Sequence, residues 1–407
     1  MPSSVTLKFK RHVNAPAAEA FRAFVHATAL RDWMCDAAQT DARPGGRLYL
    51  WWNDGYAVTG VFTKYEPGKR LAFSWHSPHD PAASLVSVTF TAKGPGTQVA
   101  LSHGGLGTGA KWRDTVKALD TGWQMGLENL QSIVETGIDL RFARRPRLGI
   151  YIGEFSAAIA RQLGVPAKAG VRLEGTADGS GAQAAGLQKD DVLVSFNGRK
   201  LAGPESIQLA VQGLQAGDKP KVVFYRGGQK HTLALELSRF PIPELPATGP
   251  ELAGQVRKLQ AEVSAAIGQT VAGLSAAQAA RRPAENEWSV LELIAHFILS
   301  ERDLQGWLAD MLNDVVIEDW LQMRPNVNAR LGALVQRFGT VAALCEEHAR
   351  AAAETADLLE ALPESFVQHR RHLYRRAAQW ALEVTPGHWH GEHAEQMQRT
   401  IAAARSA

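Results

Sequence analysis

Five residues in the C-terminal half are candidate ligands for a transition metal. They are His296, which lies within an apolar run, and the closely spaced His388, His390, Glu392 and His393. Side chains three or four positions apart in an α-helix project from one face, whereas those two apart do not. His390 with His393 is therefore a suitable ligand pair, His388 with Glu392 is a second, and His388 with His390 is not. The alternative is that these histidines are hydrogen-bonded residues of a helical bundle.

An imidazole-rich site of this kind suits one divalent zinc or nickel ion. A water molecule on an open coordination position would permit hydrolysis or thiol activation. Other catalytic signatures are absent, since the sequence has no Walker A loop, G-x-S-x-G elbow, H-E-x-x-H motif or dinucleotide fingerprint.

Composition excludes several classes of partner. The chain has 44 Lys plus Arg against 41 Asp plus Glu, a net charge of +3 that is too small to indicate a nucleic-acid binder. No apolar run approaches the ~18 residues that indicate a membrane span. The only cysteines, Cys35 and Cys345, are too few and too far apart for a disulfide framework or a zinc site. We therefore expect a cytoplasmic protein that contacts neither nucleic acid nor membrane.

The first 136 residues combine strand-like runs with many aromatic side chains. Two-residue alternation predicts strands near 5–13, 57–65, 71–75, 85–91 and 98–102, and apolar residues every three or four positions predict a long helix over 112–134. One helix packed across a curved antiparallel sheet encloses a cavity. Aromatic residues in this segment either line that cavity or fill the core. The candidates for the cavity are Trp33, Trp52, Phe62, Phe73, Trp75 and Trp123.

Six short pieces of this segment carry a family resemblance. They are Asn14-Ala15-Pro16, Arg43-Pro44-Gly45-Gly46, Thr59-Gly60-Val61, Leu71-Ala72-Phe73-Ser74-Trp75, Gly96-Thr97-Gln98-Val99 and Gly122-Trp123 followed by Leu127 and Leu130. In this order they resemble the helix-grip proteins related to the activator of Hsp90 ATPase, within the START-like (SRPBCC) superfamily. The resemblance implies a domain that binds a hydrophobic ligand or a client, or that acts on a chaperone.

A second unit runs from Leu148 to about Arg239. Leu148-Gly149-Ile150 and the run from Ala182 to Gly198 resemble a PDZ domain of the type attached to bacterial serine proteases. The resemblance implies capture of a peptide or protein C-terminus by β-strand addition. Leu148, Gly149 and Ile150 would form the carboxylate loop and Ile152 would continue the edge, with Ile207 and Val211 lining the side-chain pocket. The alternative is that these are plain core residues and another part of the chain fills the groove.

A Pro-rich linker at 241–250 leads into helix formers, with helices predicted near 250–273, 289–312, 326–361 and 387–404. The run from Trp288 to His296, together with Trp389-His390-Gly391-Glu392-His393, resembles the DinB-like four-helix proteins, which include metal-dependent thiol transferases and hydrolases. The resemblance makes His296 and His390 metal ligands. The third ligand position falls on Ala394, and His393 is the nearest substitute.

These patterns predict a multidomain α+β chain: a helix-grip START-like domain (1–142), a PDZ domain (143–240), the Pro-rich linker (241–250) and an all-α four-helix bundle (251–407). The leading hypothesis is a cytoplasmic binding protein, of the stress-response kind, that takes a hydrophobic ligand or client at the first domain and a peptide at the PDZ domain. The alternative is a DinB-type metal-dependent transferase or hydrolase with its site in the bundle.

Overall fold

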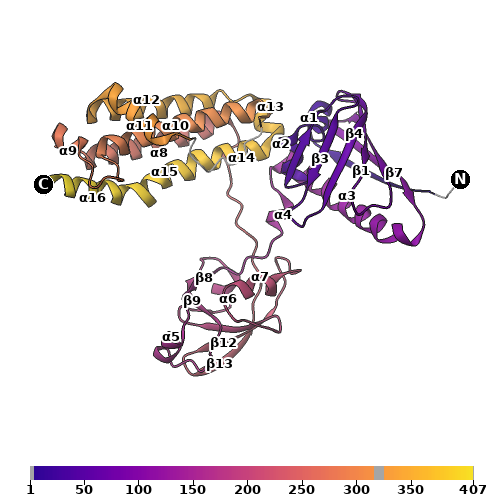
Figure 1. Ribbon diagram of the computed structural model, residues 1–407, viewed down its shortest axis with the longest axis horizontal. Helices are drawn as coiled ribbons and strands as arrows, with labels where there is room; N and C mark the ends of the chain where they lie inside the picture. The colour runs from indigo at the N-terminus through magenta and orange to yellow at the C-terminus, as the bar shows by residue number, and fades with distance from the viewer. Residues whose placement is uncertain (1–3, 316–324, 407) are drawn as a thin grey trace. The chain divides into compact units, whose positions relative to one another are not determined.

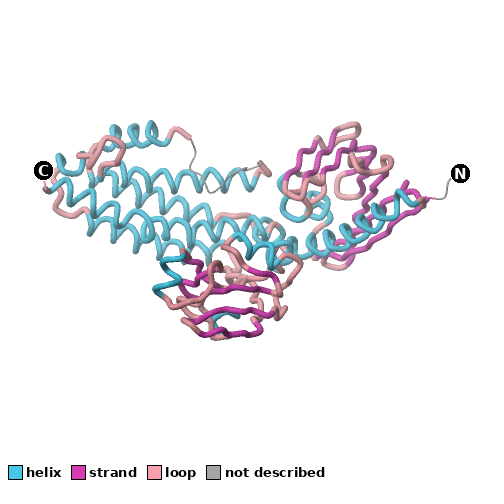
Figure 2. Tube along the Cα trace, turned by 60° about the horizontal axis from the view of Figure 1, so that its bottom comes forward, coloured by secondary structure: helices cyan, strands magenta, loops and turns pink. Residues whose placement is uncertain are grey.

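The computed structural model describes residues 4–315 and 325–406. The chain divides into two compact units, one formed by residues 1–139 with 245–407 and the other by residues 140–244. Figure 2 shows two groups of strands and one group of long helices. The multidomain α+β fold class predicted from the sequence is confirmed.

The N-terminal part of the first unit is a seven-stranded antiparallel sheet in the order β1-β7-β6-β5-β4-β3-β2. Its strands are β1 (Ser4–Val13), β2 (Ala37–Thr40), β3 (Arg47–Trp51), β4 (Ala57–Glu66), β5 (Arg70–Trp75), β6 (Ser84–Lys93) and β7 (Gly96–Gly107). Its helices are α1 (Ala17–Arg22), α2 (Ala27–Trp33) and the 27-residue α3 (Ala110–Thr136). The predicted strands and long helix lie where expected, and β2 and β3 were not predicted.

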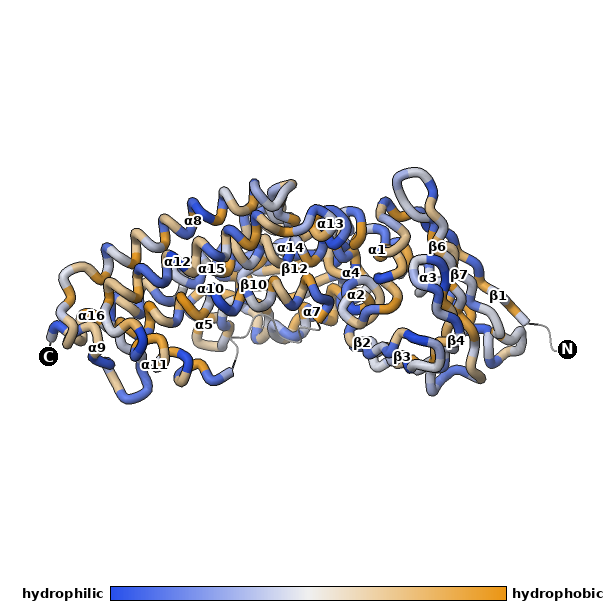
Figure 3. The backbone as a smooth tube through the Cα atoms, turned by 90° about the horizontal axis from the view of Figure 1, so that it is seen from above, coloured by the Kyte–Doolittle hydropathy of each residue, from blue (hydrophilic) through white to orange (hydrophobic). Residues whose placement is uncertain are grey.

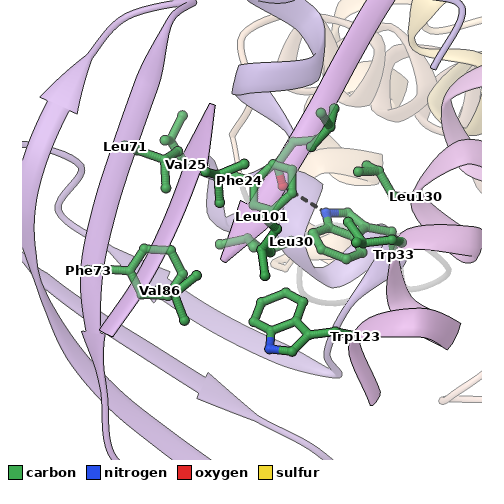
Figure 4. Close-up of a cluster of buried hydrophobic side chains, with 14 of the residues drawn as sticks. Phe24, Val25, Leu30, Trp33, Leu71, Phe73, Val86, Leu101, Trp123 and Leu130 are labelled. Atoms are coloured by element: carbon green, nitrogen blue, oxygen red, sulfur yellow. Dashed lines mark hydrogen bonds between the residues drawn. The ribbon is translucent and has the colours of Figure 1, made fainter. Parts of the chain in front are cut away.

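Helix α3 packs against β1 and β7 and closes the concave side of the sheet (Figure 1). Its buried face carries Trp123, Leu127 and Leu130, which recur every three or four residues. Figure 4 shows Trp123 and Leu130 beside Trp33, Phe24 and sheet residues such as Phe73. Burying each of these side chains contributes about 2 kcal/mol, which holds the helix on the sheet.

The second unit contains a smaller antiparallel sheet in the order β13-β12-β10-β9-β8, with β11 paired to β10. Its strands are β8 (Ile150–Gly153), β9 (Val171–Thr176), β10 (Val192–Phe196), β11 (Arg199–Lys200), β12 (Lys221–Arg226) and β13 (Gln229–Ala234), and its helices are α4 (Leu140–Ala143), α5 (Ala157–Gln162), α6 (Gly181–Ala184) and α7 (Glu205–Val211). Strand β8 pairs only with β9 in this order, so it is an edge strand.

The C-terminal part of the first unit is a helical bundle. Its helices are α8 (Gly249–Thr270), α9 (Ala276–Ala280), α10 (Val290–Leu312), α11 (Val327–Phe338), α12 (Val341–Glu360), α13 (Glu364–His369), α14 (Arg371–Gln379), α15 (Thr385–Gly387) and α16 (Ala394–Arg405). Two π-helical segments, Trp380–Val384 and His388–His393, link α14 to α15 and α15 to α16. Figure 3 shows apolar residues recurring along α8 and α10, the pattern of helices that bury one side.

Two helix boundaries differ from the sequence prediction. The helix expected over 326–361 is interrupted at Gly339, whose φ of 68° ends α11, and Thr340 caps the start of α12 by accepting from the Ala343 N–H. The last helical run begins at Arg371, well before residue 387. Among the described residues, no helix combines the length and apolar character that crossing a membrane requires.

Candidate functional site

Three histidine side chains converge inside the bundle. The Nε2 atom of His296 on α10 lies 2.5 Å from Nε2 of His388 and 3.1 Å from Nε2 of His393, and the last two atoms are 3.1 Å apart. His296 is 2% exposed and His393 is 9% exposed. Burial, with smaller effects of His388 and His393, lowers the pKa of His296 to about 3, so this ring is neutral and can offer a lone pair.

The π-helical segment His388–His393 explains why residues five apart meet. An α-helix places positions i and i+4 on one face, whereas the wider i→i+5 turn of a π-helix brings i and i+5 together. His388 and His393 therefore face His296 from the same side of the final helical run. This differs from the sequence expectation, which assumed α-helical spacing throughout.

The sequence expectation placed His390 beside His296 and His393. The structure brings His296 and His393 together, but it supplies His388 as the third member, and His390 is exposed. The sequence expectation starts at His390, two residues after His388, and its four-residue step ends at Ala394, one residue beyond His393. The second ligand pair expected from the sequence is His388 with Glu392, and the Glu392 side chain lies outside the described residues.

Hydrogen bonding among the three rings alone is unsatisfactory. A neutral imidazole nitrogen either carries a proton or offers a lone pair, so three such atoms in mutual contact always include one pair of the same kind. A cation between them accepts all three lone pairs and removes this conflict. The donor set thus fits one ion of the kind that takes three imidazoles and keeps an open coordination position.

Neighbouring side chains hold the rings in place. His393 Nδ1 lies 2.6 Å from Gln396 Oε1, which assigns the proton to Nδ1 and leaves the lone pair on Nε2. Trp288 packs on His296 with ring centroids 5.0 Å apart. Helix α10 has Ser289 as its N-cap, with a capping box between Ser289 and Glu292, and so begins where the sequence predicted a helix over 289–312.

A buried carboxyl lies near the histidine cluster. Glu301, His348 and His388 share the lining of a cavity of about 10 Å³, a volume that suits one water molecule. Burial raises the pKa of Glu301 to about 7, although Thr355 and Gln260 donate hydrogen bonds to it. Glu301 is 1% exposed, and no sequence motif pointed to it.

A second candidate site lies in the N-terminal part, between α3 and the sheet. Its cavity measures about 550 Å³ and is lined by Trp33, Trp52, Trp75 and Trp123, four of the six aromatic residues expected there. Phe62 and Phe73 do not line it, because they are cross-strand partners inside the core, with ring centroids 5.7 Å apart. The sequence analysis missed Tyr56 and the polar residues Asp54, His79, Asp80 and Asp114.

A buried histidine fixes two of the cavity tryptophans. Trp123 Nε1 donates to His103 Nδ1 at 3.0 Å, which assigns the ring proton to Nε2, 2.8 Å from Ser84 Oγ. Ser84 in turn donates to the carbonyl oxygen of Trp75. Burial lowers the pKa of His103 to about 4, so the ring stays neutral within this chain of bonds.

The predicted peptide site lies along β8. Leu148, Ile150 and Val211 are partly buried against the core that includes Ile207, whereas Ile152 is 41% exposed on the edge strand. Gly149 has a φ of 74°, and a Cβ there would come within 2.1 Å of the Ser180 Cβ. Its small size is therefore required by the packing of Ser180, a reason that the sequence analysis did not give.

Comparisons with known proteins match three successive parts of the chain to three families. Residues 14–135 match the family of activator of Hsp90 ATPase homolog 1-like proteins, residues 147–237 match the PDZ domain, and residues 261–397 match the DinB superfamily. The three resemblances predicted from the sequence are confirmed in this order.

Curated relatives are similar over a limited stretch. A probable periplasmic serine protease do/HhoA-like of Haemophilus influenzae is 27% identical over 106 residues, which is 26% of this chain and 23% of that protein. A probable periplasmic serine endoprotease DegP-like of Ectopseudomonas mendocina is 30% identical over 132 residues, 32% of this chain and 27% of that protein. The chain thus spans about a quarter of the length of these relatives.

Solved structures similar to this chain include a protein of Mesorhizobium loti (20% identity, 32% of this chain and 96% of that chain, TM-score 0.29). An Hsp90 activator of Plasmodium falciparum is 23% identical over 31% of this chain and 94% of that chain, with a TM-score of 0.28. The matches of the three families to successive parts of the chain are what support the three resemblances.

Proposed function

We propose that this chain is a metal-dependent transferase or hydrolase whose centre lies in the DinB-like bundle. The observation that carries the proposal is the convergence of the Nε2 atoms of His296, His388 and His393. From the sequence, a binding protein ranked first because two of the three resemblances are to binding folds, and the enzyme ranked second with its third ligand position on Ala394. A triad completed by His388 supports reversing that order.

In this proposal His296, His388 and His393 hold one zinc or nickel ion, which when bound supplies Lewis-acid activation of a water or a thiol. Gln396 orients the ring of His393 through its contact with Nδ1. Glu301, whose pKa lies near neutral, holds or releases a proton beside the His388 side of the cluster.

The other two modules act as binding domains in this proposal. The cavity under α3 takes a small apolar ligand, which is supported by its volume of about 550 Å³ and its aromatic walls. The edge strand β8 takes a peptide C-terminus, which is supported by its position at the end of the sheet. A purely ligand-binding and peptide-binding protein is the second candidate, and the cavity is the observation that favours it.

Metal content of the full-length protein tests the proposal. After dialysis against zinc or nickel and then buffer, native mass spectrometry is expected to find one ion per chain in the wild type and none in His296→Ala. Circular dichroism of the variant controls for loss of fold. A wild-type protein that retains no ion would overturn the metal-dependent function and leave the second candidate.

A further inference from the structure

The cavity in the N-terminal part is hollow because of the face that α3 turns toward it. Ala118, Gly122 and Gly126 recur every four residues among its lining residues, so they share one face of the helix and occupy little volume. A Cβ at Gly122 would meet no heavy atom within 4 Å, whereas one at Gly126 would lie 3.3 Å from the Trp33 ring. A side chain placed at position 122 would therefore enter open space.

The four indoles that line the cavity keep their N–H groups bonded within the protein. All four lining indoles donate their N–H groups within the protein: Trp33 to the Ala23 carbonyl, Trp52 to the Met34 carbonyl, Trp75 to the Tyr56 hydroxyl and Trp123 to His103 Nδ1. Ring centroids of neighbouring pairs lie 5.3 to 6.4 Å apart. An anionic ligand would find none of these N–H groups available, whereas the negative faces of the rings attract a cation.

Charged residues on the cavity lining carry one sign. Asp54, Asp80 and Asp114 are among them, and no lysine or arginine is present among the lining residues. The Asp54 carboxylate accepts from the Tyr56 backbone N–H at 2.9 Å, and Asp80 accepts from the Ser77 N–H at 2.9 Å, so both are held in position by local turns. Asp114 is the lining aspartate that belongs to α3. Carboxylates around an apolar recess concentrate cations at its mouth.

We propose that this cavity binds an organic cation: an amine or quaternary ammonium group attached to an apolar aliphatic or aromatic body. The indole faces contact the cationic head, the space beside Gly122 takes the apolar body, and the three aspartates select the positive charge. This assignment rests on the ligand-binding part of the proposed function and is independent of the histidine cluster.

Isothermal titration of the full-length protein with three matched probes tests the proposal. Benzyltrimethylammonium is the cation, neopentylbenzene is its neutral isostere and benzylsulfonate is the anion. The wild type is expected to bind the cation at least tenfold more tightly than the neutral probe, to bind the anion more weakly still, and to lose cation affinity as salt concentration rises.

Two aspartates on α3 provide a matched pair of variants. Asp114→Asn is expected to weaken cation binding several-fold and to leave the neutral probe unchanged. Asp120→Asn removes a charge from the same helix, where Asp120 accepts from Gln124 and does not line the cavity, and is expected to change neither. Gly122→Phe fills the cavity and is expected to abolish binding of the cation and of the neutral probe.

The two levels of failure are distinguishable. Equal affinity for the cation and its neutral isostere, with no effect of Asp114→Asn, would overturn the organic-cation assignment and leave a cavity for apolar ligands. Absence of binding by every probe would overturn the assignment and the ligand-binding part of the proposed function together.

Discussion

His103 illustrates how a single buried side chain connects stability to the shape of a site. It bridges Trp123 to Ser84 with both ring nitrogens, and this network is satisfied only while the ring is neutral. The three histidines of the bundle differ, because their Nε2 atoms converge and two of the three are always of the same kind, both donors or both acceptors. The His103 network is complete within the protein, whereas the three converging Nε2 atoms fit a metal ion.

Stability is expected to fall as pH falls through the range set by His103. Its pKa is about 4 when folded and 6.5 in the ordinary state, so between these values the unfolded chain binds a proton that the folded chain does not. From pH 7 to pH 5 this ring costs about 2 kcal/mol of unfolding free energy. Urea unfolding followed by tryptophan fluorescence measures the loss at the two pH values.

The control for this prediction is His103→Gln. His348, whose pKa burial also lowers to about 4, contributes in both proteins, so only the difference in slope reports His103. The variant is expected to lose about 2 kcal/mol less than the wild type over the same range. Equal losses in the two proteins would show that His103 is not held neutral.

Among the elements, regular periodicity made α3, α8, α10 and the strands β1, β4, β5, β6 and β7 predictable. The π-turn at His388–His393 was not predictable from periodicity. Side chains were assigned to helix faces with one period for the whole helix, and a local change of period moves every following side chain to a different face. Phe73 and Trp75 lie two residues apart on one face of β5 and both belong to the buried core, but only Trp75 also lines the cavity, a difference that a two-residue repeat does not encode. The small residues Ala118, Gly122 and Gly126, spaced four apart on α3, were a sequence signal for the cavity that went unused.

Removing one residue from the π-turn provides a test at this scale. Deleting Gly391 shortens the spacing of His388 and His393 from five positions to four, so an α-helix would present both rings to His296. The deletion variant is expected to keep one zinc ion per chain by native mass spectrometry. Loss of the ion with the fold intact would show that the π-turn does more than absorb one extra residue.

Gly149 and Gly164 in the second unit test how tightly the backbone just before β8 is packed. Gly149→Ala is expected to destabilise this unit by more than about 2 kcal/mol, because it adds left-handed strain and a clash with Ser180. Gly164→Ala is the matched control, since Gly164 has a φ of 67° but open space around a Cβ, and should cost only about 1 kcal/mol. Equal costs, measured by hydrogen exchange within residues 140–244, would argue against the clash.

At the scale of the whole molecule, the chain consists of two compact units that carry three kinds of site. A ligand that binds only the folded bundle stabilises the unit containing that bundle by mass action, by about 2.7 kcal/mol at a hundredfold excess over its Kd. Zinc is therefore expected to slow hydrogen exchange in α10 and α16 and to leave β9 and β10 unchanged. Equal protection of both units, or protection that persists in His296→Ala, would contradict this prediction.

The most direct test of the account compares two neighbouring histidines. Metal stoichiometry of His388→Ala and His390→Ala, measured side by side by native mass spectrometry, separates the triad of the structure from the one expected from sequence. If the triad of the structure binds the ion, His388→Ala loses it, whereas His390→Ala, which changes an exposed side chain, keeps one ion per chain. Retention of the ion by His388→Ala with its loss in His390→Ala would contradict it.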